Sequence, residues 1–156
     1  MKYTRLTKEQ FEEMHQEFIN FLATQSITAD EWAKIKEEKP EVAEQELDVF
    51  SDLVWEGVLQ KVEYLEHFSP QHMFLFKIDT IQIHLISIEI EDKNIDITTQ
   101  LGYQWLQQNL MKDSVNLYTS AKLINEDRNA DIFALIKQGA TITKGELYEW
   151  MAQKVK

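Results

Sequence analysis

The sequence contains no cysteine, so disulfide bonds, thiolate metal sites and cysteine nucleophiles are all excluded. Glycine is also scarce, with four residues among 156, and proline occurs twice. Loops that cradle phosphate groups need glycine where the backbone approaches the ligand, and the chain has no GxGxxG, GxxxxGKS/T or GxSxG motif. These absences argue against the common nucleotide-binding enzymes and serine hydrolases.

A further absence is any long uninterrupted hydrophobic run. The most continuous candidate, MFLFKIDTIQIHLISIEI, is broken by Lys77, Asp79 and Glu89, whereas a membrane-spanning helix needs about 20 mostly apolar residues. The start of the chain, MKYTRLTKEQ, is basic but leads into no apolar segment, unlike a secretory signal. We therefore expect a cytoplasmic protein that does not bind membranes.

Clusters of basic residues are missing as well, and the net charge is −11. The acidic excess is uneven: residues 1–66 carry 7 basic and 16 acidic side chains, net −9, while residues 67–156 carry 9 and 11, net −2. Nucleic acids are bound by clustered lysine and arginine, so we expect no nucleic-acid partner. We interpret the acidic residues as solvated helix faces that keep the protein soluble.

Length and composition are those of a single globular domain, residues 1–156, with 44% hydrophobic and 28% charged residues. The residue pattern predicts an α+β fold that is mostly helical: N-terminal helices, one long central helix, a β-hairpin and C-terminal helices. Helix starts are marked by capping boxes, in which a threonine and a residue three positions later cap each other's backbone N–H groups. Such boxes occur at Thr7 with Gln10, Thr28 with Glu31, and Thr143 with Glu146.

The longest predicted element is a helix from Pro40 to Phe68. Its apolar residues cover a face about 180° wide, and an acidic stripe lies opposite that face. Trp55, Leu59 and Val62 intrude into the acidic stripe at the spacing i, i+4, i+7. Because a purely solvated face would not carry these side chains, we expect that either another part of the chain or a partner covers them.

Strand signals follow this helix. Residues 72–78 alternate in pattern and residues 81–90 are rich in isoleucine, which together predict a long β-hairpin packed on helices. Residues 97–111 predict a helix without a single charged side chain, which indicates burial or an interface. Residues 114–125 fit either a helix or a third strand, and two further helices close the chain.

A cluster of possible metal ligands lies at the predicted end of the long helix. Glu63 and His67 would be one helical turn apart and His72 would reach back toward them, so these three residues are alternative ligands for a divalent ion. The simpler interpretation is a helix C-terminus where His67 interacts with the helix dipole. No residue is predicted to be catalytic, and no cofactor is predicted.

Three stretches of the chain resemble a family of small uncharacterised bacterial proteins, found chiefly in Bacteroidota. They are FINFLATQSITADEW, PEVAEQELDVFSDLVWEGVLQKVEYLEHFSPQHMFLFK and IFALIKQGATITKGELYEWM. The resemblance covers nearly the whole chain. It implies a bacterial cytosolic origin, but it carries over no function and no site residues.

We predict a protein of unknown function that acts without catalysis, in protein–protein interaction or assembly, with self-association as one form. The predicted interface residues are Trp55, Leu59, Val62 and Trp105, because aromatic side chains anchor interfaces. The alternative is a metal-binding protein or metal-dependent hydrolase that uses the Glu/His cluster. A third interpretation, a small-ligand pocket between the hairpin and the helices, leaves no trace in the sequence.

Overall fold

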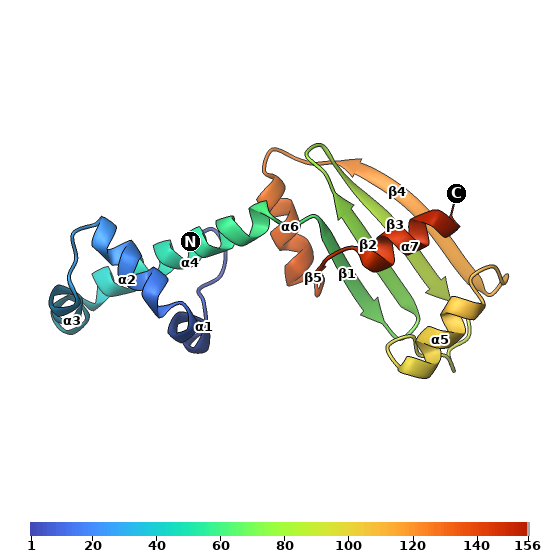
Figure 1. Ribbon diagram of the computed structural model, residues 1–156, viewed down its shortest axis with the longest axis horizontal. Helices are drawn as coiled ribbons and strands as arrows, with labels where there is room; N and C mark the ends of the chain where they lie inside the picture. Colours follow the sequence, from blue (N-terminus) through green and yellow to red (C-terminus); the bar gives the residue numbers. More distant parts are fainter. Residues whose placement is uncertain (156) are drawn as a thin grey trace. The chain divides into compact units, whose positions relative to one another are not determined.

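A computed structural model describes residues 1–155 of the protein (Figure 1). Within that range the chain forms seven helices and a five-stranded antiparallel sheet, with 48% of residues in helices and 22% in strands. This confirms the predicted α+β fold with mostly helical content. The chain divides into two compact units, residues 1–60 and the part from Lys61 onward. The prediction of a single domain stays a prediction.

The first unit is helical and has an aromatic core. The ring of Phe18 lies 5.0 Å from that of Phe50 and 5.3 Å from that of Trp32, measured between centroids. Aromatic pairs at such distances contribute about 0.5–1.5 kcal/mol beyond the surface they bury. The helices that carry and surround these rings are α1 (Lys8–Glu13), α2 (His15–Thr24), α3 (Ala29–Glu38) and α4 (Pro40–Gln60).

Residues 2–6 form a segment, termed the N-terminal clasp, that binds the acidic face of α4. The carboxylate of Asp52 accepts hydrogen bonds from the backbone N–H groups of Lys2 (2.8 Å) and Tyr3 (2.9 Å). The Tyr3 hydroxyl donates to Glu56, and burial together with this bond raises the pKa of Tyr3 to about 12. A carboxylate that accepts two N–H groups at once is a strong anchor, because each bond involves a charged acceptor.

The clasp also uses Arg5 and Thr4. Nε of Arg5 donates to Asp48 (2.7 Å), and its guanidinium pairs with Glu44 as well. The carbonyl oxygen of Thr4 accepts a hydrogen bond from Nε1 of Trp55 (3.0 Å). These acidic residues of α4, interpreted from the sequence as a solvated face, therefore hold the clasp in place.

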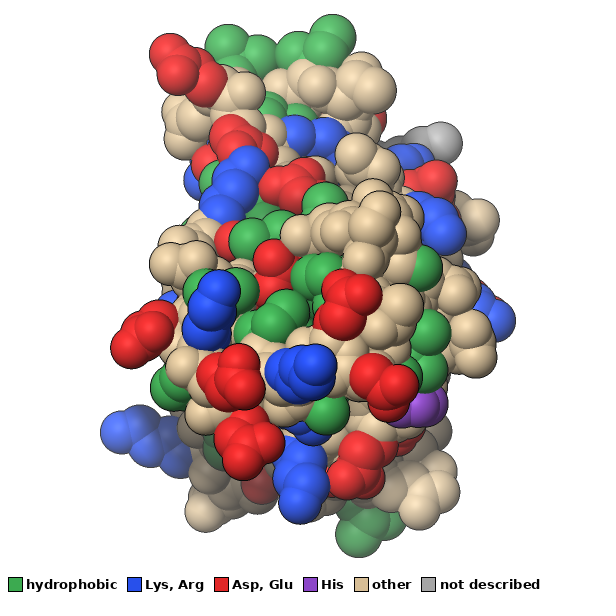
Figure 2. Space-filling model, turned by 90° about the vertical axis from the view of Figure 1, so that its left-hand side faces the viewer, with side chains coloured by type: hydrophobic (Ala, Val, Ile, Leu, Met, Phe, Trp, Pro, Cys, Tyr) green, Lys and Arg blue, Asp and Glu red, His purple; other side chains and the backbone are tan. Residues whose placement is uncertain are grey.

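Basic side chains are dispersed on the face of the molecule drawn in Figure 2. Lys and Arg side chains lie singly between acidic ones there, and hydrophobic side chains are interspersed among both. No basic patch of the kind that binds a phosphate backbone gathers on that face. The view agrees with the acidic excess of residues 1–60, where 6 basic and 14 acidic side chains give a net charge of −8.

The second unit is a sheet with three helices. Its strand order is β4-β3-β2-β1-β5, and every neighbouring pair is antiparallel. The elements, in chain order, are β1 (Tyr64–Ser69), β2 (His72–Ile78), β3 (Gln82–Ile90), α5 (Gln100–Gln108), β4 (Val115–Leu123), α6 (Arg128–Lys137), β5 (Thr141–Thr143) and α7 (Glu146–Lys154).

The helix predicted from Pro40 to Phe68 is wrong beyond Gln60, where α4 ends. The following residues form β1, which pairs along its whole length with β2 across a turn at Pro70. The segment that switches to strand, YLEHFS, contains two aromatic residues, which fit a pleated sheet surface. Ladder pairing with β2 outweighs the local helical pattern, which sequence periodicity alone does not reveal.

The later elements follow the sequence more closely. The predicted hairpin is confirmed as β2 and β3, and the ambiguous residues 114–125 contain strand β4. The uncharged helix is shorter than predicted, because α5 begins after Thr99, whose hydroxyl accepts a hydrogen bond from the Gly102 amide (3.0 Å). The third capping box does not form: Thr143 ends β5, and its hydroxyl accepts from the Gly145 amide (3.2 Å) instead.

Two helices, α5 and α7, cover one face of the sheet, and α6 lies on the other (Figure 1). Side chains alternate between the two faces along each strand. On β1, Glu66 and Phe68 face α5 and α7, while His67 faces the side of α6. The core beneath α5 and α7 is fully buried and consists mainly of Met73, Leu75, Ile86, Ile88, Leu106 and Met151.

Helix α7 is attached to the sheet by a shared carboxylate. Oε1 of Glu149 accepts hydrogen bonds from Nζ of Lys77 (2.7 Å) and from the hydroxyl of Tyr64 (2.6 Å). The bond from Lys77 is the larger cause that lowers the pKa of Glu149. Because Tyr64 and Lys77 lie on neighbouring strands, this cluster fixes α7 against both β1 and β2.

Candidate functional site

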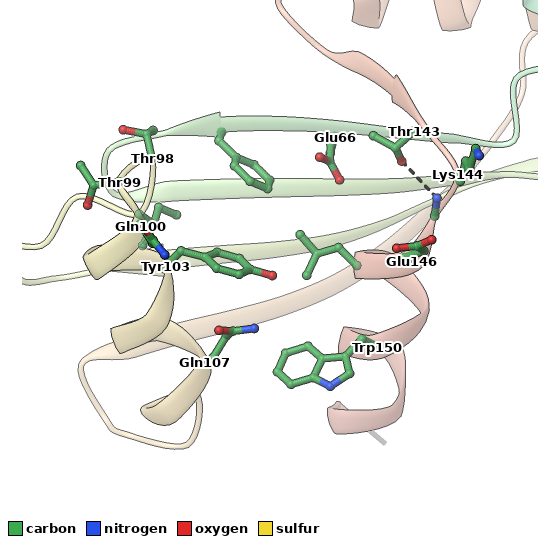
Figure 3. A pocket seen from close by; sticks show the side chains of 14 residues that line it. Glu66, Thr98, Thr99, Gln100, Tyr103, Gln107, Thr143, Lys144, Glu146 and Trp150 are labelled. Atoms are coloured by element: carbon green, nitrogen blue, oxygen red, sulfur yellow. Dashed lines mark hydrogen bonds between the residues drawn. The ribbon is translucent and has the colours of Figure 1, made fainter.

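The space between α5 and α7 is an open cavity of about 810 Å³, with β1 as its floor (Figure 3). Small-ligand sites in proteins typically measure about 300–1,000 Å³ and combine apolar walls with a few convergent polar groups. The lining residues come from β1, from the segment that leads into α5, from α5 itself, and from the end of β5 with the first turns of α7. All of these parts belong to the second compact unit.

Glu66 is the ionisable group at the floor of the cavity. Its carboxyl group points from β1 into the space, toward the side of Tyr103 (Figure 3). Among residues 1–155, no side chain or amide donates a hydrogen bond to this carboxylate, and burial alone raises its pKa. Burial, with a smaller contribution from the charge of Glu66, also raises the pKa of Tyr103.

Three aromatic side chains line the same cavity as this carboxylate. Phe68 lies on the same face of β1, Tyr103 projects from α5, and Trp150 projects from α7 (Figure 3). The amide of Gln107 also points from α5 into the cavity. The cavity thus combines aromatic side chains with the carboxylate of Glu66 and with neutral polar side chains, which are those of Thr98, Thr99, Gln100, Gln107 and Thr143.

The rim of the cavity carries one charge of each sign. Lys144 and Glu146 are both exposed, and they stand at the connection between β5 and α7 (Figure 3). With Glu66 and Tyr103, they complete the titratable groups that line the cavity. Solvent screens the two rim charges more strongly than the half-buried Glu66, so Glu66 dominates the electrostatics inside.

Two glycines let the helices of the cavity walls approach their neighbours. Gly145 adopts φ +86°, and a Cβ atom at this position would lie 2.4 Å from the ring of Tyr64. A Cβ atom at Gly102 would lie 1.7 Å from the backbone oxygen of Asp96. Because neither position has room for a side chain, these glycines set the placement of α7 and α5.

The predicted interface stripe on the long helix is divided in the structure. The indole of Trp55 lies against the clasp, with its ring centroid 6.5 Å from that of Tyr3. Leu59 and Val62 are 0% and 2% exposed. The chain itself therefore covers Leu59 and Val62, while Trp55 is half-buried. An interface at these positions stays a prediction.

Trp105, the fourth predicted interface residue, lies on α5 and is partly buried against the core of the second unit. Nζ of Lys112 lies 6.0 Å from its ring centroid. The same helix exposes Leu101, which is 80% exposed. The absence of charge in this helix therefore reflects both core packing and an exposed uncharged face.

The structure does not bring the predicted metal ligands together. Glu63 precedes β1 and His67 lies within it, so an extended backbone replaces the helical turn that would have placed them side by side. His72 stacks on Phe74, with 2° between the ring planes. Within residues 1–155, no group of three histidine, aspartate or glutamate side chains is arranged to hold a metal ion.

Sequence reasoning missed Glu66 as a site residue. It assigned Glu66 to the acidic stripe of a helix, because the end of α4 was placed too late. A correct strand assignment would have put Glu66 and Phe68 on one face. Tyr103 and Trp150 come from two separate helices, so only the tertiary fold shows that they line the same cavity as Glu66.

The class of the protein follows from this fold: it is an α+β protein whose antiparallel sheet carries an open aromatic cavity beneath two helices. The chain belongs to a family of unknown function, DUF6495, whose model matches residues 1–156. This confirms the family resemblance, while a bacterial origin stays a prediction. Searches of curated proteins and of solved structures gave no match. Among the described residues, no helix is both long and apolar enough to span a membrane.

Proposed function

We propose that the protein binds a small organic amine without catalysis, with the ammonium group at Glu66 and the apolar body among Phe68, Tyr103 and Trp150. The observation that carries this proposal is the carboxylate of Glu66, which points into an aromatic cavity and accepts no hydrogen bond from residues 1–155. Partial withdrawal of a carboxylate from water is unfavourable unless a donor or a cation pairs with it. An ammonium group supplies both, and aromatic faces attract cations.

The chemistry of the cavity also selects against other ligands. An anion would meet the charge of Glu66 at the floor and that of Glu146 at the rim, and the cation at the rim, Lys144, is exposed. A neutral apolar ligand would leave the carboxylate of Glu66 without a partner. The arrangement therefore favours a cation with an aromatic or aliphatic body of modest size.

Isothermal titration calorimetry with phenethylamine tests this proposal, with phenethyl alcohol as the neutral control and hydrocinnamate as the anionic one. We expect binding of the amine, and binding at least about tenfold weaker for both controls, because a hydrogen bond to a charged group contributes about 1.5–3 kcal/mol. Glu66→Gln should cause a similar loss, while Glu63→Gln, an exposed glutamate outside the cavity, should leave binding unchanged. Equal affinity for amine and alcohol, or unchanged amine binding by Glu66→Gln, would overturn the proposal.

The affinity for the amine should also depend on pH. Burial raises the pKa of Glu66, so its carboxyl group takes up a proton at a higher pH than an exposed glutamate does. The protonated group no longer attracts a cation. We therefore expect amine binding to weaken as pH falls through the raised pKa of Glu66, and titrations at a series of pH values check this.

A second candidate function, the interaction or assembly role predicted from the sequence, is favoured by a separate observation. Strand β4 ends the sheet on one side, and its nine residues have no neighbouring strand on their outer edge within the described part of the chain. An open strand edge is a template for pairing with another strand. Amide hydrogen exchange tests this role: protected outward amides of β4 at high protein concentration would support it, and fast exchange at every concentration would contradict it.

A further inference from the structure

The outer edge of β4 presents a regular row of backbone groups, of which the N–H of Val115 already donates to the carbonyl oxygen of Lys112 (3.0 Å). The hydrogen bonds from Ile124 N to Ile81 O (2.8 Å) and from Glu91 N to Ser114 O (3.0 Å) show that the even-numbered residues of this segment face β3. In an antiparallel ladder, the alternate residues then turn their N–H and C=O groups outward. The outward residues are Val115, Leu117, Thr119, Ala121 and Leu123.

This edge lacks the features that usually keep sheet edges from pairing. Proteins protect such edges with prolines, bulges or several charges. β4 has no proline, pairs with β3 without a bulge, and contains none of the 27 acidic residues of the chain. Its single charged residue is Lys122. In a protein of net charge −11, an acid-free edge avoids the repulsion that would otherwise oppose association of two copies.

We propose that the occupant of this edge is β4 of a second copy of the chain, paired antiparallel about a two-fold axis at Thr119. This inference rests on the assembly role proposed above and names its partner. In that register the nine residues of each strand lie opposite those of the other copy, and Thr119 exchanges both of its outward backbone hydrogen bonds with its own symmetry mate, while the N–H of Val115 keeps its bond to Lys112. Apolar residues then face apolar residues, with Val115 opposite Leu123 and Leu117 opposite Ala121.

Charge complementarity favours this register. Lys122 of one copy lies opposite Asn116 of the other, and Asn116 is directly paired with Glu89 of β3. The side chain of Asn116 already donates to Glu91 (3.2 Å). Because neighbouring strands are about 4.8 Å apart, a lysine side chain spans the one intervening strand and reaches this acidic pair. The two-fold axis produces the contact twice.

The pairing also gives partial cover to an exposed leucine. Leu123 is 67% exposed in the single chain, whereas Val115 is 7% exposed and belongs to the core under α5 and α7. In the proposed register, each Leu123 lies beside Val115 of the other copy. The sheet would then continue from one copy into the next, with the open edges of both β4 strands removed.

Cysteine cross-linking tests the register, since the natural chain has no cysteine that would interfere. Thr119→Cys places two thiols on residues directly opposite each other, about 5.5 Å apart at Cα, which suits a disulfide. Ser120→Cys is the matched control, because its two copies would be diagonal neighbours about 7–8 Å apart. We expect mild oxidation to convert Thr119→Cys to a covalent dimer and to leave Ser120→Cys largely uncross-linked.

Light scattering with size exclusion tests the assembly itself. We expect twice the chain mass for the natural protein and a shift to monomer for Ala121→Pro, because the amide of residue 121 faces outward and its loss leaves the β3 ladder intact. Far-ultraviolet circular dichroism checks that Ala121→Pro folds. If it does not fold, the comparison of Thr119→Cys with Ser120→Cys still decides the register. A natural chain that stays monomeric at about 1 mM overturns both the assembly role and this inference. A dimer in which Ser120→Cys cross-links and Thr119→Cys does not overturn only the register.

Discussion

The carboxylates that bind the N-terminal clasp have hydrogen-bond donors, whereas the carboxylate in the aromatic cavity has none among residues 1–155. Asp52 accepts two backbone N–H groups from the clasp, and its neighbours on α4 hold Arg5. Glu66 accepts no hydrogen bond from residues 1–155, although it is half-buried. The first arrangement stabilises the folded chain, since each bond involves a charged acceptor.

The difference separates a carboxylate that stabilises the fold from one that is available to a ligand. The acidic side chains of α4 find their hydrogen-bond donors within the chain itself, in the N-terminal clasp. An unpaired carboxylate in a cavity disfavours folding, and proteins retain such unfavourable groups where function requires them. Substitutions in the cavity, in the clasp and at a third, paired carboxylate test this difference.

The largest loss of folding stability is expected for Gly102→Ala, in a helix that forms a wall of the cavity. The added Cβ atom would meet the backbone oxygen of Asp96, so α5 must move away from the segment that leads into it. Forced overpacking of this kind typically costs about 3 kcal/mol. Urea unfolding measures this loss, and phenethylamine binding should fall with it.

Gly57→Ala is the matched control for this substitution on α4. No atom lies within 4 Å of a Cβ atom built at Gly57. Because glycine inside a helix is less favourable than alanine, this variant should gain about 0.5–1 kcal/mol. A loss of stability in Gly57→Ala, or none in Gly102→Ala, would show that the two glycines are not constrained as described.

Asp52→Ala is expected to have the next largest effect, on the side of the clasp. It removes the shared acceptor of the Lys2 and Tyr3 amides, and the loss should be about 2 kcal/mol because the acceptor is charged. Urea unfolding measures the difference from the natural chain. Gln45→Ala, at an exposed site on the same helix, should change stability by less than about 0.5 kcal/mol. Equal effects of the two substitutions would contradict the role of the clasp.

A smaller loss of stability is expected when Asp79, a paired carboxylate within the second unit, is replaced. The amides of Gln82 and Ile81, followed by His84, lower the pKa of Asp79 to about 2. Because its pKa is lowered, the ionised Asp79 stabilises the fold at pH values above 3.8, the ordinary pKa of the group. This stabilisation is lost as the pH falls through about 2. Asp79→Asn should therefore lower the Tm at pH 7, and this difference should shrink as the solution is acidified.

The smallest effect, of opposite sign, is expected for Glu66→Gln. A raised pKa means that the folded chain binds a proton more tightly than the unfolded chain, so its stability falls as pH rises from 4.5 through the raised pKa. Removing the charge should leave the Tm at pH 7 equal or slightly higher, with no difference below pH 4. A clear decrease in Tm at pH 7 would mean that Glu66 has a structural partner.

The sequence predicted the fold class and the hairpin well, because alternating and isoleucine-rich segments leave few alternatives to a strand. It placed the end of α4 too late, since Tyr64, Leu65 and Phe68 continue the helical period of the preceding residues. That single error moved Glu66 from a cavity floor to a helix surface. The cavity itself was not predictable, because it depends on where α5 and α7 pack on the sheet.

Carbon-13 nuclear magnetic resonance of the Glu66 carboxyl group measures whether this carboxylate receives a ligand cation. A pH titration in the free protein should give a pKa above the ordinary glutamate value. Saturating phenethylamine should lower that pKa, because a bound ammonium stabilises the ionised form. A pKa that is normal in the free protein, or one that the amine leaves unchanged, would contradict the account.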